Sequence, residues 1–142
     1  MSVKQLSIFA ENKNGALYEI TSLLAEGGIN TRAFSVAETG SFGVFRLIVS
    51  DPRKAAMILS EAGKVVNVTD VVGAAISDDA GGLASLLRVL TEKEIAVEYL
   101  YAFVAASVGK AYVVLRVADN AAAETLLSEN GFSILTDEDL RL

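Results

Sequence analysis

The spacing of apolar residues predicts a strand followed by a helix at the start of the chain. The segment Leu6 to Phe9 has strand composition. The segment Asn14 to Gly28 places apolar residues on one helical face, namely Leu17, Ile20, Leu23 and Leu24. Asn14 is a suitable N-cap for this helix, and the glycine pair 27–28 is a typical stop signal.

A hairpin, a second helix and a fourth strand are expected next. The segments 29–37 and 43–49 are rich in β-forming residues and flank a glycine-containing connection, which predicts two antiparallel strands. Asp51 supplies the cap of a helix over 52–63, whose first position takes the only proline of the chain. Residues 64–69 then complete a β-α-β-β-α-β unit.

The same pattern occurs a second time about 66 residues later. Gly15-Ala16-Leu17 falls on Gly81-Gly82-Leu83, and after two residues of drift Asp51 falls on Asp119. The second copy predicts strands over 71–76, 95–105, 111–117 and 133–135, helices from Leu83 through Leu90 and over 120–130, and a fraying acidic end at 137–139.

The expected fold class is α+β, with two ferredoxin-like βαββαβ units, antiparallel sheets and helices on one face of each sheet. Only Asp70 separates the copies, so the predicted domains are 1–70 and 71–142, without a flexible linker. Each half has roughly 70 residues, which is near the lower limit of independent stability. We therefore expect the halves to pack on each other or on a partner.

Composition narrows the classes of function. The net charge is −6 and the 12 basic residues form no run, which disfavours nucleic-acid binding. Cysteine and histidine are absent, which removes disulfides, most zinc sites and the commonest general base, so we expect no metal and no cofactor. The N-terminal segment turns polar too soon for a signal peptide or a membrane span, so a cytoplasmic location away from membranes is expected.

The connection between the first strand and first helix of each copy is the candidate binding site. It reads Asn12-Lys13-Asn14-Gly15-Ala16-Leu17 in one copy and Asp78-Asp79-Ala80-Gly81-Gly82-Leu83 in the other. A helix N-terminus presents unpaired N–H donors that suit a carboxylate, and glycine allows a ligand to approach the backbone. Leu17 and Leu83 are expected to point inward as core anchors. Any strand-to-helix turn needs similar residues, but their recurrence in both copies favours binding.

In these loops and this order of elements the chain resembles the ACT domains, in particular the stand-alone proteins with two ACT units. The resemblance covers nearly all 142 residues. It implies an amino-acid ligand where one ACT unit meets another, with loop N–H groups on its carboxylate and the start of the second strand supplying side chains. It also implies a homodimer and a regulated protein that responds to the ligand.

The resemblance carries over to particular residues. Asn12 takes the place of an acidic residue in the ACT loop, and Gly15 and Leu17 match its glycine and leucine. Asn30, followed by Thr31, matches a polar position after the helix where ACT domains often place a ligand contact. The Asn30 amide could bind both charged groups of an amino acid, or it could cap the start of the strand.

The second copy departs from the first in ways that predict unequal sites. Asp78, Gly81 and Leu83 keep the loop pattern, but Ala96 stands where the first copy has Asn30. Neither copy has the proline that many ACT domains carry before the glycine. We therefore expect the first copy to hold the better site and the second to be largely structural.

Three classes of function follow. An amino-acid-sensing regulatory module is the leading interpretation, and the alternative is a ligand-free ACT scaffold for oligomerisation or protein interaction. An enzyme has the least support, because no nucleophile, base and orienting group can be assembled without His or Cys. The alternation of Tyr99, Tyr101 and Phe103 could stack nucleic-acid bases, although it is more often one face of a packed sheet.

Overall fold

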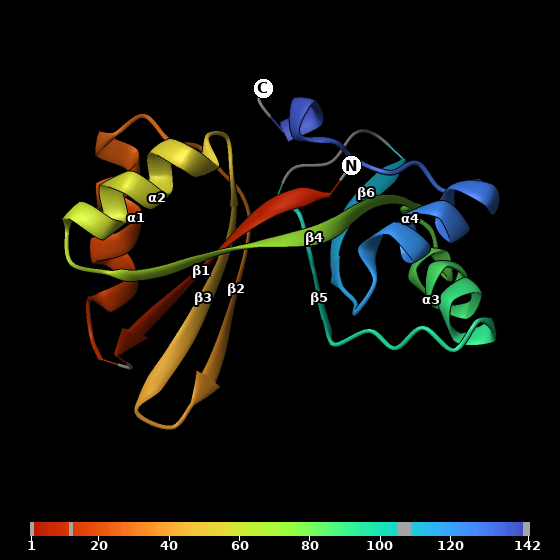
Figure 1. Ribbon diagram of the computed structural model, residues 1–142, viewed down its shortest axis with the longest axis horizontal. Coiled ribbons are helices and arrows are strands. Elements are labelled where there is room, and N and C mark those ends of the chain that lie inside the picture. The colour runs from red at the N-terminus through yellow and green to blue at the C-terminus, as the bar shows by residue number, and fades with distance from the viewer. Residues whose placement is uncertain (1, 12, 105–108, 141–142) are drawn as a thin grey trace. The chain divides into compact units, whose positions relative to one another are not determined.

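The computed structural model describes residues 2–11, 13–104 and 109–140 (Figure 1). Its elements are β1 (Val3–Glu11), α1 (Ala16–Glu26), β2 (Thr31–Thr39), β3 (Phe42–Val49), α2 (Pro52–Glu61), β4 (Val65–Ser77), α3 (Gly82–Glu92), β5 (Tyr99–Ala102), β6 (Lys110–Arg116), α4 (Asn120–Glu129) and the 3-10 helix η1 (Asp137–Leu140). Contacts divide the chain into an N-terminal unit, Lys4–Thr69, and a C-terminal unit, Asp70–Leu140 with residues 2–3.

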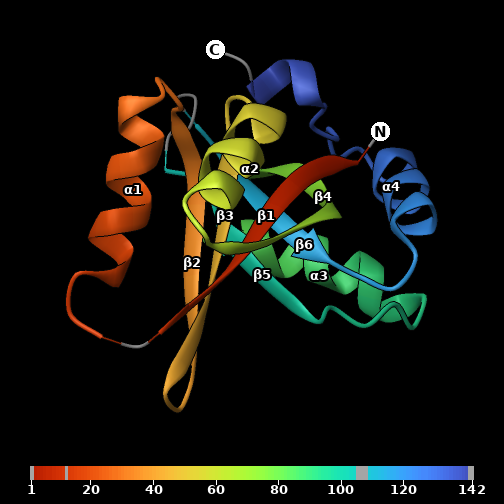
Figure 2. The same cartoon turned by 60° about the vertical axis from the view of Figure 1, so that its left-hand side comes forward.

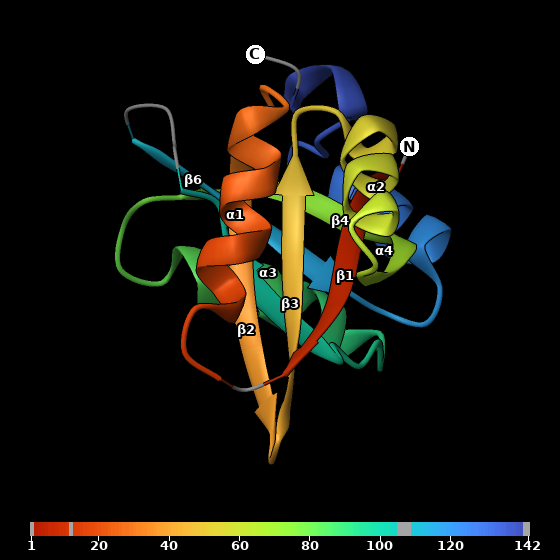
Figure 3. The same ribbon diagram turned by 90° about the vertical axis from the view of Figure 1, so that its left-hand side faces the viewer.

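The N-terminal unit is a sheet with both helices on one face. Its strands follow the order β2-β3-β1-β4, and β3 pairs antiparallel with both β1 and β2. Figure 3 shows α1 and α2 in front of these strands. The core between helices and sheet is aliphatic apart from one aromatic ring, and it comprises Leu6, Ile8, Ile20, Leu24, Ile29, Phe45, Leu47, Val49, Ala55 and Leu59.

The C-terminal unit repeats this arrangement with shorter strands. Its strands follow the order β4-β6-β5, and Ile134 forms an isolated bridge to Ala74 of β4. The buried positions of α3 and α4 include Leu86, Leu90 and Leu127. They correspond to Ile20, Leu24 and Leu59 of the N-terminal unit, so the repeat in the sequence is a repeat of the core. The predicted fold class is confirmed.

Three details of the strands differ from the prediction. The strands expected over 64–69 and 71–76 are one continuous strand, β4, because the residue between them is neither glycine nor proline and can stay extended. Of the strand expected over 95–105, the described residues form β5, which starts at Tyr99 because its partner β6 ends opposite it at Arg116; residue 105 lies outside the described residues. Residues 133–135 make only the bridge at Ile134.

Two further predictions are corrected, one for the length of the hairpin connection and one for the acidic C-terminal segment. The hairpin connection has two residues, Gly40 and Ser41, because Thr39 pairs directly with Phe42. Gly40 has φ 77°, as the first central position of a tight II′-type turn requires. The acidic end, expected to fray, forms η1, where the Asp139 carboxylate accepts the N–H of Thr136 at 2.7 Å.

The second helix of each unit is capped by the aspartate that precedes it in the sequence. The Asp51 carboxylate accepts the N–H of Lys54 at 3.1 Å, and the Asp119 carboxylate accepts the N–H of Ala122 at 3.1 Å. The predicted cap at Asp51 and the predicted equivalence of Asp51 and Asp119 are confirmed.

The predicted row of aromatic residues packs within the C-terminal unit. The rings of Tyr99 and Tyr101 stack with their centroids 6.4 Å apart, and Tyr101 is buried. Phe103 meets Tyr112 edge to face at 6.1 Å. Intramolecular packing therefore accounts for the alternation of these residues along the chain.

Candidate functional site

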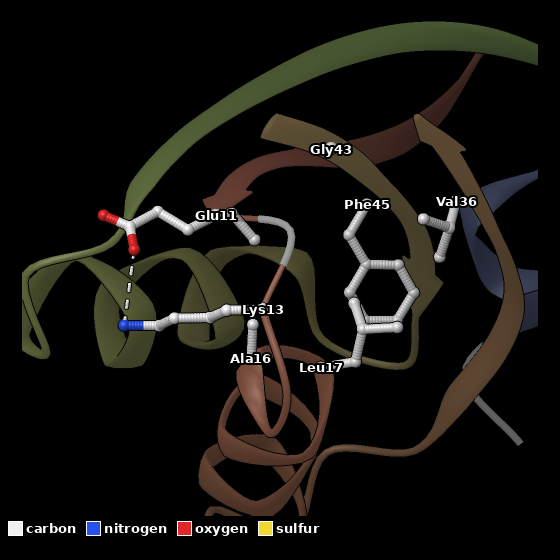
Figure 4. Close-up of a pocket in the computed structure, with 8 residues that line it drawn as sticks. Glu11, Lys13, Ala16, Leu17, Val36, Gly43 and Phe45 are labelled. Atoms are coloured by element: carbon white, nitrogen blue, oxygen red, sulfur yellow. Dashed lines mark ion pairs between the residues drawn. The ribbon is translucent and has the colours of Figure 1, made fainter. Parts of the chain in front are cut away.

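A pocket of about 90 Å³ opens beside the first turn of α1 in the N-terminal unit (Figure 4). Figures 2 and 3 show this turn and the β2–β3 hairpin toward the same end of the unit. The lining comes from β1, the turn that follows it, α1, β2 and β3, and consists of Ala10, Glu11, Lys13, Ala16, Leu17, Val36, Gly43 and Phe45. Six of these eight residues are apolar.

Two small residues on neighbouring strands leave this space open. Ala10 of β1 and Gly43 of β3 are direct partners in the antiparallel pairing. Since neither carries a side chain beyond Cβ, nothing fills the volume above them. Figure 4 shows the ring of Phe45 and the side chains of Val36 and Leu17 around this opening.

The turn before α1 presents backbone donors. Gly15 occupies the cap position with φ 87°, in the left-handed region that favours glycine, and no side chain caps the helix. The predicted N-cap role of Asn14 is therefore wrong. The N–H of Ala16 donates to the Lys13 carbonyl at 3.3 Å, whereas those of Leu17 and Tyr18 meet no acceptor within the described residues.

Charged side chains of both signs stand at the pocket. Lys13 Nζ lies 3.4 Å from Glu11 Oε2, and both side chains are largely exposed (Figure 4). Further along α1, the hydrogen bond and charge of Lys64, whose Nζ lies 2.9 Å from Glu19 Oε1, lower the pKa of the Glu19 carboxyl. Exposed amide donors at the start of a helix suit a carboxylate, and an exposed anion suits an ammonium group.

The structure gathers part of the predicted site and separates the rest. Ala16 and Leu17 line the pocket, and Asn14 and Gly15 belong to the same turn. Asn12 lies outside the described residues.

Asn30 and Thr31 follow the other end of α1. This helix has 11 residues and is therefore about 16 Å long. Within the unit they are not brought to the pocket. Asn30 instead bonds through its backbone, its N–H donating to Ser50 Oγ at 3.0 Å.

The leucines of the two loops are not core anchors. Leu17 is 42% exposed and Leu83 is 37% exposed, so the prediction that they point inward is wrong. The buried positions are one residue earlier, at Ala16 and Gly82, because the buried stripe of each helix continues from there to Ile20 and Leu86. The exposure of Leu17 leaves it available to the pocket.

Comparison with known families decides what this fold is. The model of a protein family described as "ACT domain pair" matches residues 1–142 of the chain. The chain belongs to this ACT family.

Two solved structures are similar to this ACT pair. The chain is similar to protein BT0572 from Bacteroides thetaiotaomicron, with 41% identity, a TM-score of 0.92, and coverage of 99% of this chain and 96% of that one. It is also similar in fold to the regulatory subunit of aspartate kinase from Thermus thermophilus, at 15% identity and a TM-score of 0.67, covering 90% of this chain and 91% of that one. No curated protein matches the chain.

The C-terminal ACT unit has different residues at the position of the pocket. Ile76 pairs with Ala111 where the N-terminal unit pairs Ala10 with Gly43. Ile76 belongs to the core cluster of its unit, so its side chain occupies the equivalent volume. The pair of small residues at this position therefore occurs in the first unit and not in the second.

In the C-terminal ACT unit, residues of the equivalent loop make hydrogen bonds within the protein. Asp79, at the position of Lys13, accepts the Ser77 hydroxyl at 2.7 Å. Asp78 is exposed, and its N–H donates to the Gly109 carbonyl at 3.2 Å. Gly81 has φ 90°, as Gly15 does, and a Cβ at Gly82 would overlap the carbonyl oxygen of Ser77.

Most pocket residues of this ACT pair were not predicted as site residues. They are Ala10, Glu11, Lys13, Val36, Gly43 and Phe45. One signal was present: Gly43 interrupts a strand pattern, which often marks a close approach of a ligand or another backbone. Alignment of the two copies would have strengthened this signal. The second copy has alanine at this position, so the strand itself does not require glycine there.

Two further properties bear on the chemistry of the described residues. Within 2–11, 13–104 and 109–140, no three acidic, cysteine or histidine residues gather as they would around a metal ion. In the same ranges, no helix has the length and apolar character needed to cross a membrane.

Proposed function

We propose that this ACT pair is a non-enzymatic cytoplasmic regulatory module that senses an amino acid. The observation that carries the proposal is the pocket of the N-terminal unit, which opens beside the exposed amide groups of Leu17 and Tyr18. An α-carboxylate would accept hydrogen bonds from these amides, and Lys13, which lines the same pocket, adds a positive charge to its surroundings. The ligand side chain would then enter the space above Ala10 and Gly43.

We place this site in the N-terminal unit alone. Ile76 supports this assignment because it occupies the equivalent volume of the second unit, and Asp79 supports it because it puts a negative charge where Lys13 is positive. The C-terminal unit then has a structural role. One ligand per chain is expected in calorimetry, and two equal sites per chain would contradict the assignment.

A homodimer partner would complete the site. Leu17 and Val36 are 42% and 51% exposed beside the pocket, so a ligand resting on them stays partly in water unless another surface covers it. An ACT unit of a second copy, with its Asn30 and Thr31, would supply that cover. Ligand binding then favours one arrangement of protomers, which a regulated protein can recognise.

A thermal-shift screen of the twenty amino acids tests the proposal. A ligand that binds only the folded protein raises its melting temperature by mass action. Gly15→Val should weaken the shift by placing a β-branched residue at positive φ in the turn, and Asn30→Ala should weaken it by removing the partner's contact. Gly81→Val in the second loop is the matched control for Gly15→Val.

The outcomes separate the candidate functions. If no amino acid shifts the melting temperature, the chain is better described as an ACT scaffold for oligomerisation or protein interaction. If one does and neither Gly15→Val nor Asn30→Ala changes its affinity, the ligand binds elsewhere.

A further inference from the structure

The lining of the pocket restricts the side chain of its ligand. Ala10, Ala16, Leu17, Val36, Gly43 and Phe45 are apolar, and Lys13 and Glu11 are the two charged residues of the lining. A polar or charged ligand side chain in the apolar part would lose its hydrogen bonds to water without replacing them. The lining therefore favours an apolar side chain.

The volume indicates the size of the side chain that this unit can enclose. The pocket holds about 90 Å³. An apolar cavity of about 150 Å³ accepts a ring of six carbon atoms. By proportion, this pocket accommodates three or four carbon atoms, which is the size of an isopropyl or isobutyl group.

We propose that the N-terminal pocket selects an amino acid with a branched aliphatic side chain, as in valine, leucine and isoleucine. This inference rests on the proposed amino-acid site and names its ligand class. The α-carboxylate lies toward Lys13 and the first turn of α1, while the branched methyl groups contact Phe45, Val36 and Leu17. Ala10 and Gly43 set the depth that the side chain reaches.

Isothermal titration of the full chain with amino acids that share the same charged end tests the inference. Each buried methylene contributes roughly fourfold in affinity, so leucine should bind on the order of 50-fold tighter than alanine. Serine, threonine, aspartate and lysine should bind no better than alanine.

Two variants connect this preference to the pocket. Ala10→Ile with Gly43→Ala reproduces the filled pair of the second unit, and it should remove the advantage of leucine over alanine. At Gly43 a Cβ would make only ordinary contacts, 3.5 Å from the Ala37 carbonyl oxygen, so the fold tolerates this change. Ala84→Ile, on the exposed side of α3, adds the same side chain away from the pocket as a control.

A second variant tests the pocket without filling it. Val36→Ser should reduce leucine affinity several-fold. Val68→Ser is its control, because Val36 and Val68 are equally exposed at 51% and only Val36 lines the pocket. Circular dichroism and the melting temperature of each variant confirm that it is folded.

The possible results distinguish this inference from the proposed function. Tightest binding of a polar or charged amino acid, or leucine binding that survives both pocket variants, would overturn the inference and leave amino-acid sensing intact. Binding of none of the twenty amino acids would overturn the proposed function, and the inference with it.

Discussion

Ala10 of β1 lies directly opposite Gly43 of β3, whereas the corresponding pair in the second unit is Ile76 and Ala111. The two units have the same fold and the same order of elements, and this exchange leaves an opening in one where the other has a core side chain. A difference of four carbon atoms between the two pairs therefore distinguishes a candidate ligand pocket from a packed sheet.

Substitutions that exchange alanine and isoleucine at the two equivalent positions should have opposite consequences. Ile76→Ala is expected to lower the free energy of unfolding by about 2–4 kcal/mol, because it removes packed atoms from the core. Ala10→Ile adds apolar atoms to an open space and should leave stability unchanged or slightly higher. Urea denaturation of both variants measures the difference, and a large loss for Ala10→Ile would mean that the pocket cannot accept a side chain.

Glu94 is the natural target for a stabilising substitution. It has φ 56°, the only positive φ of a residue other than glycine in the described part of the chain, and Gly28 holds the equivalent place with φ 73°. Because the left-handed conformation costs an ordinary residue about 1–2 kcal/mol, Glu94→Gly should stabilise the protein by up to about 1 kcal/mol. Chemical denaturation checks the sign, and Gly28→Ala should change stability in the opposite direction.

Gly82 should not tolerate even alanine. A Cβ there would overlap the carbonyl oxygen of Ser77, which belongs to the backbone and cannot rotate away. We expect Gly82→Ala to cost about 1–3 kcal/mol, in the range of other overpacked positions. The reverse change in the other unit, Ala16→Gly, serves as the comparison, and its cost should stay below about 1 kcal/mol.

The capping aspartates should contribute equally in the two units. Asp51→Ala and Asp119→Ala each remove a carboxylate that accepts a helix N–H at 3.1 Å, and each should cost about 1 kcal/mol. Asn14→Ala should have little effect on stability, because Gly15 takes the cap position of α1 without a side-chain hydrogen bond. Equal losses at Asn14 and Asp51 in denaturation experiments would contradict this difference.

The Glu19–Lys64 ion pair predicts a pH dependence of stability. Lys64 lowers the pKa of Glu19 below its ordinary value of 4.5, so the folded state binds this proton less readily than the unfolded state. The resulting stabilisation is present above the ordinary value and disappears as the pH falls through the lowered pKa.

Glu19→Gln should therefore flatten the loss of stability on acidification below about pH 4.5. An NMR titration of the Glu19 carboxyl in Lys64→Met should show its pKa returning toward the ordinary value. Unchanged titration of Glu19 in that variant would remove Lys64 as the cause.

The sequence by itself determined the repeat, the α+β class and the helices. The apolar faces through Ile20 and Leu86 and the cap at Asp51 depend on residues close in sequence, and the repeat places Asp119 at the position of Asp51; the structure confirms all of these. Local propensity and periodicity carry this information because helices and their caps form within a few residues of each other.

Only the tertiary structure decided the pocket. Ala10 and Gly43 are far apart along the chain and become partners only through the register of β1 with β3, which no local pattern reveals. The same holds for Leu17, whose exposure depends on where the buried stripe of α1 meets the sheet. Cross-strand pairing and helix rotation are set by the whole unit, and for that reason the loop was predicted while the space beside it was not.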